Sequence, residues 1–215
     1  MNYVTDDTMN AYLRSVQPMY DGVLGEIQKE AIAAEVPIVP PEVARLLSVL
    51  LTMQKPKNIL EIGTAVAFSA GLMCRYLPEE GTVTTIDRYE VMLKDARVNI
   101  KRMGLEDKIK ILEGDAADIL QTLEGPYDVI FMDAAKGQYI HWLPDILRLL
   151  STGGVLVSYN VLQDGDIIES RFAVERRNRT IHARMREYLY TLTHMPEFQT
   201  SVVPIGDGVA LSVKR

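Results

Sequence analysis

The sequence contains little cysteine and no long apolar run. Cys74 is the one thiol among 215 residues, which excludes an internal disulfide and a zinc site built from cysteines. No stretch reaches the roughly 18 uninterrupted apolar residues of a membrane-spanning helix. The first residues, MNYVTDDTMNAYL, lack the basic segment and apolar block of a secretory signal. We therefore expect a cytoplasmic protein with no membrane partner.

Positive charge and phosphate-binding motifs are also scarce. Lys and Arg total 23 against 29 Asp and Glu, and the formal net charge is −6. This balance disfavours a general polyanion binder, although a local basic patch can act differently. Neither G-x-G-x-x-G nor G-x-x-x-x-G-K-[ST] occurs, so a pyrophosphate group is not the expected ligand.

From residue 58 onward, short apolar runs alternate with amphipathic segments. Strands are expected at residues 58–64, 81–88, 109–115, 127–135 and 154–160. Helices are expected at residues 69–77, 90–104, 116–123, 139–150 and 180–194. Residues 198–205 and 208–215 flank a GDG turn and predict a closing hairpin. The pattern predicts an α/β fold with a mostly parallel central sheet, helices on both faces and an antiparallel hairpin at one edge.

The chain shows no internal repeat, linker or low-complexity tract, so we expect residues 1–215 to form a single domain. Residues 1–35 have apolar positions at three- and four-residue spacing. They predict a helical segment, broken near Pro18, that packs on this domain. Residues 41–54 predict a further helix with a proline just inside its start.

Three successive strands end in an acid. Glu61 with Gly63 closes the first strand, Asp87 the second and Asp115 the third. Ligands of α/β sheets bind beyond the carboxyl ends of the strands. Asp87 follows Gly63 by 24 residues, where an acid can accept both hydroxyls of a ribose. The pattern predicts a nucleoside pocket in which Asp115 frames an adenine. The competing interpretation is a tight turn and three unrelated surface acids.

Six segments together resemble the S-adenosylmethionine-dependent O-methyltransferases of the catechol and caffeoyl-CoA type: ILEIGTAVAFSA, TIDR, GDA, DVIFMDAAKGQY, GGVLVSYNVL and PIGDGVALS. The likeness extends from about Val36 to the C-terminus and implies a Rossmann-like class I methyltransferase fold and a homodimer. It implies that the first acid-glycine motif binds the methionine part of the cofactor, that Asp87 binds the ribose and that Asp115 lies at the adenine. The cofactor-binding residues implied are Val36, Ile38, Glu61, Gly63, Ser69, Asp87, Arg88, Asp115, Ala116 and Asp133.

The resemblance also implies a reacting end at Asp133 and Lys136, the expected catalytic residues. Methyl transfer needs an acceptor oxygen that has lost its proton and is aligned with the methyl group; a divalent ion supplies both conditions. A nearby lysine can take the proton if its pKa is lowered. In the resembled family Mg²⁺ is bound by this aspartate and by an Asp-Asn pair after the fifth strand. The Asn falls on Asn160, and Tyr159 occupies the position of the Asp.

Tyr159 is the main departure from the family pattern. A neutral phenol is a poor Mg²⁺ ligand, so we expect weak or absent Mg²⁺ binding unless Asp164 or Asp166 on the following loop reaches inward. The contrary interpretation is that Tyr159 stacks on the acceptor, while Asp133 and Asn160 suffice for the ion.

Two acceptor classes fit the resemblance, and a third interpretation is non-catalytic. The segments DAAKGQY, ERRNR and EFQTSVVPIGDG look more like the bacterial tRNA 5-hydroxyuridine methyltransferases than the plant or animal enzymes, which implies a tRNA partner and 5-methoxyuridine as the product. The expected phosphate contacts are Arg171, Arg176, Arg177 and Arg179, which otherwise form a solvated helix face. The alternatives are an O-methyltransferase of small catechol-like phenols and a cofactor-binding protein whose catalysis Tyr159 impairs. Trp142 is expected in the core rather than as a stacking platform.

Overall fold

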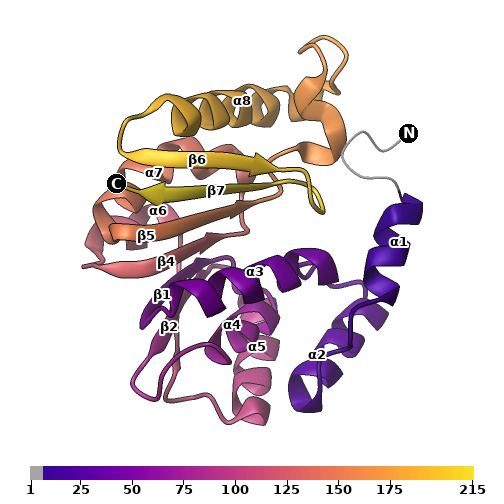
Figure 1. The fold of residues 1–215 in the computed structure, drawn as a ribbon, viewed down its shortest axis with the longest axis vertical. Coiled ribbons are helices and arrows are strands. Elements are labelled where there is room, and N and C mark those ends of the chain that lie inside the picture. Colours follow the sequence, from indigo (N-terminus) through magenta and orange to yellow (C-terminus); the bar gives the residue numbers. More distant parts are fainter. Residues whose placement is uncertain (1–6) are drawn as a thin grey trace.

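The computed structural model of the protein describes residues 7–215, and a seven-stranded sheet lies at its centre. The strand order is β3-β2-β1-β4-β5-β7-β6 (Figure 1). The strands are β1 Asn58–Ile62, β2 Thr82–Asp87, β3 Ile109–Glu113, β4 Tyr127–Met132, β5 Leu150–Tyr159, β6 Phe198–Val203 and β7 Val209–Lys214. Strands β1 to β5 are parallel, and β7 runs antiparallel to both β5 and β6. The expected sheet and closing hairpin are confirmed.

Helices cover both faces of this sheet. The α-helices are α1 Asp7–Ser15, α2 Gly22–Ala33, α3 Pro41–Gln54, α4 Phe68–Cys74, α5 Glu90–Met103, α6 Ala116–Thr122, α7 Tyr139–Leu149 and α8 Arg179–His194. Three short 3₁₀ turns are η1 Lys136–Gln138, η2 Gln163–Ile168 and η3 Arg176–Asn178. Helices α2 to α5 pack on one face, and α6 to α8 pack on the other.

The two faces follow from the alternation of side chains along each strand. On β1, Ile59 belongs to the core under α2 to α5, and Leu60 belongs to the core under α6 to α8. Successive strand residues point to opposite faces, and a parallel sheet covered on both sides therefore needs apolar residues at both parities. This requirement explains the uninterrupted apolar runs of the sequence.

Strand β5 begins earlier than the sequence predicts. Its pairing with β4 joins Tyr127 to Leu150 and then Val129 to Val155, so the register shifts between these pairs. The extra β5 residues bulge out around Gly153, whose φ is +76°. Glycine and serine in this segment favour a turn by composition, and the sheet overrides that local preference.

The N-terminal segment forms two helices with a break between them. Residues 16–21 separate α1 from α2, as expected from Pro18. Arg14 of α1 forms an ion pair of 2.8 Å with Glu42 at the start of α3. The side chain of Glu42 is only 1% exposed, so this contact holds α1 against the end of α3 that faces the site.

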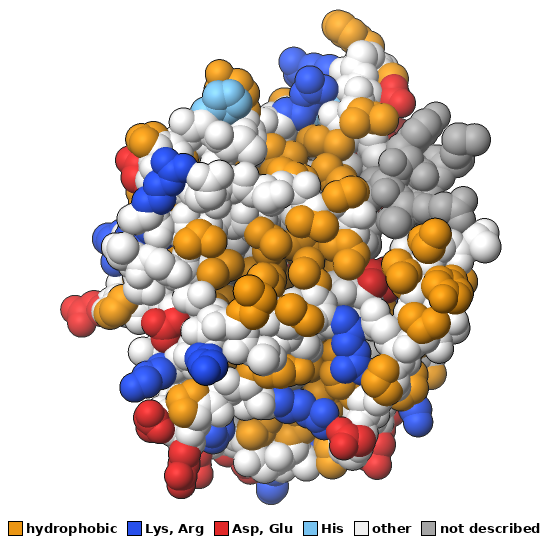
Figure 2. Space-filling model, in the orientation of Figure 1, with side chains coloured by type: hydrophobic (Ala, Val, Ile, Leu, Met, Phe, Trp, Pro, Cys, Tyr) orange, Lys and Arg blue, Asp and Glu red, His pale blue; other side chains and the backbone are white. Residues whose placement is uncertain are grey.

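Figure 2 shows hydrophobic side chains gathered over the middle of one face, where α3 and β7 lie. Val49 and Met53 of α3 and Val213 of β7 are exposed. Among residues 7–215, no helix is both long and apolar enough to cross a membrane. The expected homodimer stays a prediction.

Candidate active site

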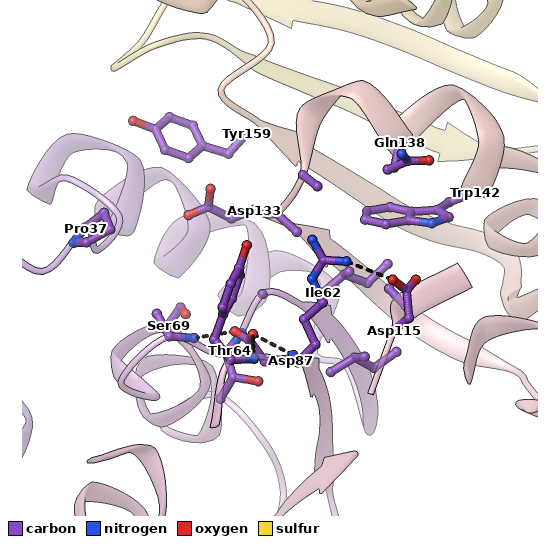
Figure 3. Close-up of a pocket in the computed structure, with 18 of the residues that line it drawn as sticks. Pro37, Ile62, Thr64, Ser69, Asp87, Asp115, Asp133, Gln138, Trp142 and Tyr159 are labelled. Atoms are coloured by element: carbon purple, nitrogen blue, oxygen red, sulfur yellow. Dashed lines mark hydrogen bonds and ion pairs between the residues drawn. The ribbon is translucent and has the colours of Figure 1, made fainter. Parts of the chain in front are cut away.

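A cavity of about 940 Å³ lies at the carboxyl ends of the five parallel strands β1 to β5 (Figure 3). Its size suits a drug-sized ligand, since such sites occupy roughly 300–1,000 Å³. In Figure 3, Asp133 lies near the middle of the cavity, with Tyr159 on one side and Ser69 on the other. The predicted site residues that line the cavity are Ile38, Gly63, Ser69, Asp87, Arg88, Asp115, Ala116, Asp133, Tyr159 and Asn160.

Three of the predicted cofactor-binding and catalytic residues lie outside the wall of this cavity. Val36 lines a second hollow of about 270 Å³ between α2 and α5. Glu61 is completely buried behind the wall, and Lys136 lies next to Asn160 at the rim. The sequence placed Val36 correctly on the loop before α3, but Pro37, Ile38 and Val39 are the residues of that loop that reach the cavity.

Gly63 is required by a close approach within the protein itself. Its φ is +106°, and a Cβ at this position would lie 2.1 Å from the carbonyl oxygen of Asp133. The backbone N–H of Asp133 donates to Ile62 at 2.9 Å, which brings the ends of β1 and β4 together. The sequence predicted a glycine that lets a ligand approach. In the structure the same glycine also lets two strand ends approach each other.

Asp87 connects two loops of the cavity wall. Its Oδ2 accepts hydrogen bonds from the backbone N–H groups of Thr64 at 3.0 Å and Ala65 at 3.1 Å. Its Oδ1 accepts from the N–H groups of Arg88 at 2.7 Å and Tyr89 at 3.0 Å. Hydrogen bonds to an ionised acceptor are stronger than neutral ones. Asp87 therefore fixes the shape of the wall on which a ribose would rest.

Glu61 is a fully buried carboxyl group with an unused oxygen. Thr85 Oγ1 donates to Glu61 Oε2 at 2.6 Å, whereas Oε1 has no hydrogen-bond partner among residues 7–215. Burial raises the pKa of this carboxyl to about 8. A buried atom without a partner fits either a bound proton or a cationic ligand group beyond the wall.

We predict that replacing Glu61 with glutamine flattens the pH dependence of stability. The pKa of Glu61 is raised from 4.5 to about 8 on folding, so the folded state keeps the proton to higher pH. Its contribution to the free energy of unfolding is full below pH 4.5 and is lost as the pH rises to about 8. Chemical denaturation of the cofactor-free wild type and of Glu61→Gln should show their difference changing across this window. A constant difference would contradict the assignment.

The far end of the cavity is closed by a surface ion pair. Arg88 Nη1 lies 3.0 Å from Asp115 Oδ2, and Asp115 Oδ1 accepts from the N–H of Ala117 at 2.9 Å as the cap of α6. Trp142 lines the same end; it is 5% exposed, and its Nε1 is buried without a partner in the described chain. Trp142 therefore belongs to the core, as expected, and also forms part of the cavity wall.

Tyr139 brings the ends of β4 and β5 together at the reacting end. Its buried hydroxyl lies 3.2 Å from the carbonyl oxygen of Met132 and 3.3 Å from that of Tyr159, and it accepts from the N–H of Ala134 at 3.1 Å. Asp133 and Asn160 follow directly after these strands. Burial raises the pKa of Asp133 to about 6, and the charge of Lys136 acts in the opposite direction.

Asp207 joins Lys136 and Asn160 in a polar cluster at the rim. With the Asn160 amide oriented to satisfy both of its ends, Nδ2 donates to Asp207 Oδ2 at 2.6 Å and Oδ1 accepts from Lys136 Nζ at 3.3 Å. Lys136 Nζ also lies 3.8 Å from Asp207 Oδ2. The Asp207 side chain is 11% exposed. The sequence indicated this residue only as part of a hairpin turn.

The loop after β5 does not bring Asp164 or Asp166 into the site, which was the alternative that the sequence left open. Asp164 and Asp166 do not line the cavity, and the side chain of Asp164 is exposed. The backbone N–H of Asp164 instead donates to Asp207 Oδ1. The carboxylate that approaches the site comes from the turn between β6 and β7. Gly206 and Gly208, with φ of +56° and +83°, allow this turn.

Tyr159 packs beside the turn between β6 and β7. Its side chain is 7% exposed, and burial raises the pKa of its hydroxyl above the ordinary value, so the phenol stays neutral. A Cβ on Gly206 would lie 3.2 Å from this hydroxyl and 2.7 Å from a methyl group of Val43. Tyr159 therefore fills the space between the β6–β7 turn and α3.

The donors at this end do not fit a magnesium ion. Mg²⁺ needs several oxygen ligands, preferably anionic, in near-octahedral geometry. Tyr159 offers a neutral phenol, and the amide oxygen of Asn160 already faces an ammonium group. Within residues 7–215, no cluster of three or more His, Cys, Asp or Glu side chains is arranged to hold a metal ion.

Comparison with known proteins identifies the family. A catechol O-methyltransferase of Niastella koreensis is 32% identical over 175 residues, covering 79% of each chain. A caffeoyl-CoA O-methyltransferase of Populus kitakamiensis is 31% identical and covers 80% of this chain and 76% of the relative. The structure of an O-methyltransferase from Bacillus cereus in complex with SAH has a TM-score of 0.82 at 28% identity, covering 97% of both chains. Residues 16–215 match the O-methyltransferase family, and the chain belongs to it.

Proposed function

We propose that this protein transfers a methyl group from S-adenosylmethionine to one hydroxyl of a small phenol with two neighbouring hydroxyls. The observation that carries the proposal is the continuous cavity that joins Asp87 and Asp115 at one end to Asp133 and Asn160 at the other. One end suits a nucleoside, and the other suits a polar reacting group. Relatives named for catechol and caffeoyl-CoA support this acceptor class.

The residues of the wall fit the cofactor. Asp87 presents a carboxylate to the ribose, and Trp142 contributes to the wall near the end that would hold the base. Glu61 has an unused oxygen behind the turn of Gly63, where the amino acid end of the cofactor would lie. The SAH complex of the Bacillus cereus relative supports the same cofactor class.

The acceptor end is suited to a flat aromatic ring. Pro37, Val39 and Phe68 contribute apolar surface, and Tyr159 contributes an aromatic side chain. Asp133 has a pKa of about 6, so near neutral pH its carboxylate can take the hydroxyl proton of a phenol. As that proton leaves, the oxygen bonds to the methyl carbon, and the carbon–sulfur bond breaks with its electron pair remaining on sulfur.

Two of the four arginines that suggested tRNA have partners within the protein. Arg179 donates to the carbonyl oxygens of Val174 at 3.2 Å and Phe172 at 3.3 Å. Arg177 pairs with Glu175 at 2.8 Å. Arg171 and Arg176 are exposed. Arg179 therefore supports the segment before α8, whereas the other three arginines are exposed, and tRNA is the second candidate acceptor.

An acceptor competition separates the two candidates. We expect transfer of labelled methyl groups to a simple catechol to exceed transfer to unmodified or 5-hydroxyuridine-containing tRNA. Replacing Arg171 and Arg176 with alanine should leave the catechol rate unchanged, since neither residue lines the cavity. The tRNA interpretation wins if tRNA is methylated faster and its binding falls steeply with salt. Cofactor binding without transfer to any acceptor would favour the non-catalytic interpretation.

A further inference from the structure

The reacting end of the cavity has a positively charged side chain beside it, that of Lys136. Lys136 Nζ lies 3.3 Å from the Asn160 amide oxygen and 3.8 Å from Asp207 Oδ2. Its side chain is 31% exposed, so the lysine is partly buried. It is also near enough to Asp133 to stabilise that carboxylate electrostatically.

We propose that the Lys136 ammonium supplies the positive charge for the acceptor oxygen, and that Asp207 is the positioning residue that holds it there, so that methyl transfer proceeds without a divalent ion. The inference rests on the proposed function and identifies the group that supplies positive charge to the acceptor oxygen. A positive charge that is held in place in a partly dehydrated site stabilises a developing oxyanion more strongly than the same charge in water.

The position of Asp207 favours an ammonium over a metal ion. Its Oδ2 accepts from Asn160 Nδ2 at 2.6 Å, which turns the amide oxygen of Asn160 toward Lys136. Its Oδ1 accepts from the backbone of Asp164. Both oxygens of Asp207 are therefore engaged in orienting other groups. A magnesium ion would have to break these contacts and displace Lys136 while gaining only one other carboxylate, Asp133.

Tyr159 occupies the space beside the turn that carries Asp207. Its ring packs between Gly206 and α3. The residue that replaces a carboxylate thus also supports the turn that delivers Asp207. The presence of Tyr159 therefore removes a possible metal ligand and supports the turn that holds Asp207 near Lys136.

The first test uses metal binding and the chelator response. We expect the wild-type chain, saturated with S-adenosylhomocysteine, to bind no Mn²⁺ by electron paramagnetic resonance, and its catechol methylation rate to be equal in Mg²⁺ and in EDTA. Tyr159→Asp should gain Mn²⁺ binding, since it restores a second carboxylate. Wild-type Mn²⁺ binding that disappears in Asp207→Asn, or a wild-type rate abolished by EDTA, would overturn the proposal.

The second test separates charge from structure. Lys136→Met should lower kcat by roughly 10²–10³-fold, and Lys136→Arg should recover part of that loss. Asp207→Asn keeps an acceptor for the backbone of Asp164, so it should lower kcat to a smaller degree while leaving the Kd of the cofactor unchanged; Asp207→Glu should recover part of the rate. Asp166→Asn, which removes a carboxylate of η2 outside the cavity, is the matched control. Equal kcat values for Lys136→Met and the wild type would overturn the proposal.

Different results would contradict the proposed acceptor class and the role of Lys136. If the cofactor binds but no phenol is methylated under any condition, the proposed acceptor class is wrong. The Mn²⁺ measurement on the wild type and on Lys136→Met then still decides the charge assignment. Mn²⁺ binding by Lys136→Met but not by the wild type supports the assignment of the positive charge to Lys136. Equal Mn²⁺ binding by both proteins contradicts that assignment.

Discussion

Asp87→Ala is expected to weaken S-adenosylmethionine binding by about 10²–10⁴-fold. Each hydrogen bond to a charged group contributes roughly 1.5–3 kcal/mol, and two ribose hydroxyls would lose their acceptor. The substitution also releases the backbone N–H groups of Thr64, Ala65, Arg88 and Tyr89 from their shared carboxylate. Isothermal titration calorimetry measures the change directly.

Asp118→Ala provides the matched control for this experiment. Asp118 is an exposed carboxylate on the same cavity wall, located in α6. Its removal changes the net charge equally without disturbing the two loops. Similar affinity losses in both variants would show that charge alone matters, and an unchanged affinity in Asp87→Ala would remove Asp87 from the cofactor site.

Gly63→Ala is expected to destabilise the fold by at least about 3 kcal/mol. The new Cβ would meet the Asp133 carbonyl oxygen at 2.1 Å, and backbone atoms cannot rotate away as a flexible side chain does. Either β1 and β4 separate at their carboxyl ends or the turn changes conformation. Urea denaturation reports the loss of stability, and cofactor affinity should fall with it.

Gly153→Ala distinguishes this clash from simple backbone strain. Gly153 also has a positive φ, +76°, but a Cβ there meets no atom within 4 Å. An alanine at such a position costs only about 1–2 kcal/mol. If the two variants lose the same stability, the close approach of Asp133 is not what requires glycine at position 63.

The parts of the fold that depend on local periodicity could be predicted from the sequence. The strand ends at Glu61, Asp87 and Asp133 were located because buried parallel strands are apolar at consecutive positions and polar residues follow where each strand ends. Helix α3 was placed at Pro41–Gln54 because proline fits the first helical turn. These features require no knowledge of distant contacts.

The features that depend on contacts between distant segments could not be predicted. Asp207 lies 47 residues after Asn160 in the sequence, and only the antiparallel pairing of β5 with β7 brings the two together. Arg179 was predicted to contact phosphate, with a solvated helix face as the alternative. Its hydrogen bonds to the carbonyl oxygens of Phe172 and Val174 could not be predicted from composition. Val36 was one residue away from the stretch that reaches the cavity, which is the usual uncertainty of placing a loop from its sequence.

The four backbone hydrogen bonds of Asp87 also have an entropic consequence. Ordering a loop around an incoming ligand consumes part of the binding free energy, because the chain loses conformational freedom. Here Thr64 and Ala65 are tied to β2 through a carboxylate that belongs to the protein. The nucleoside end is therefore preorganised before the cofactor arrives, and more of the interaction energy remains available as affinity.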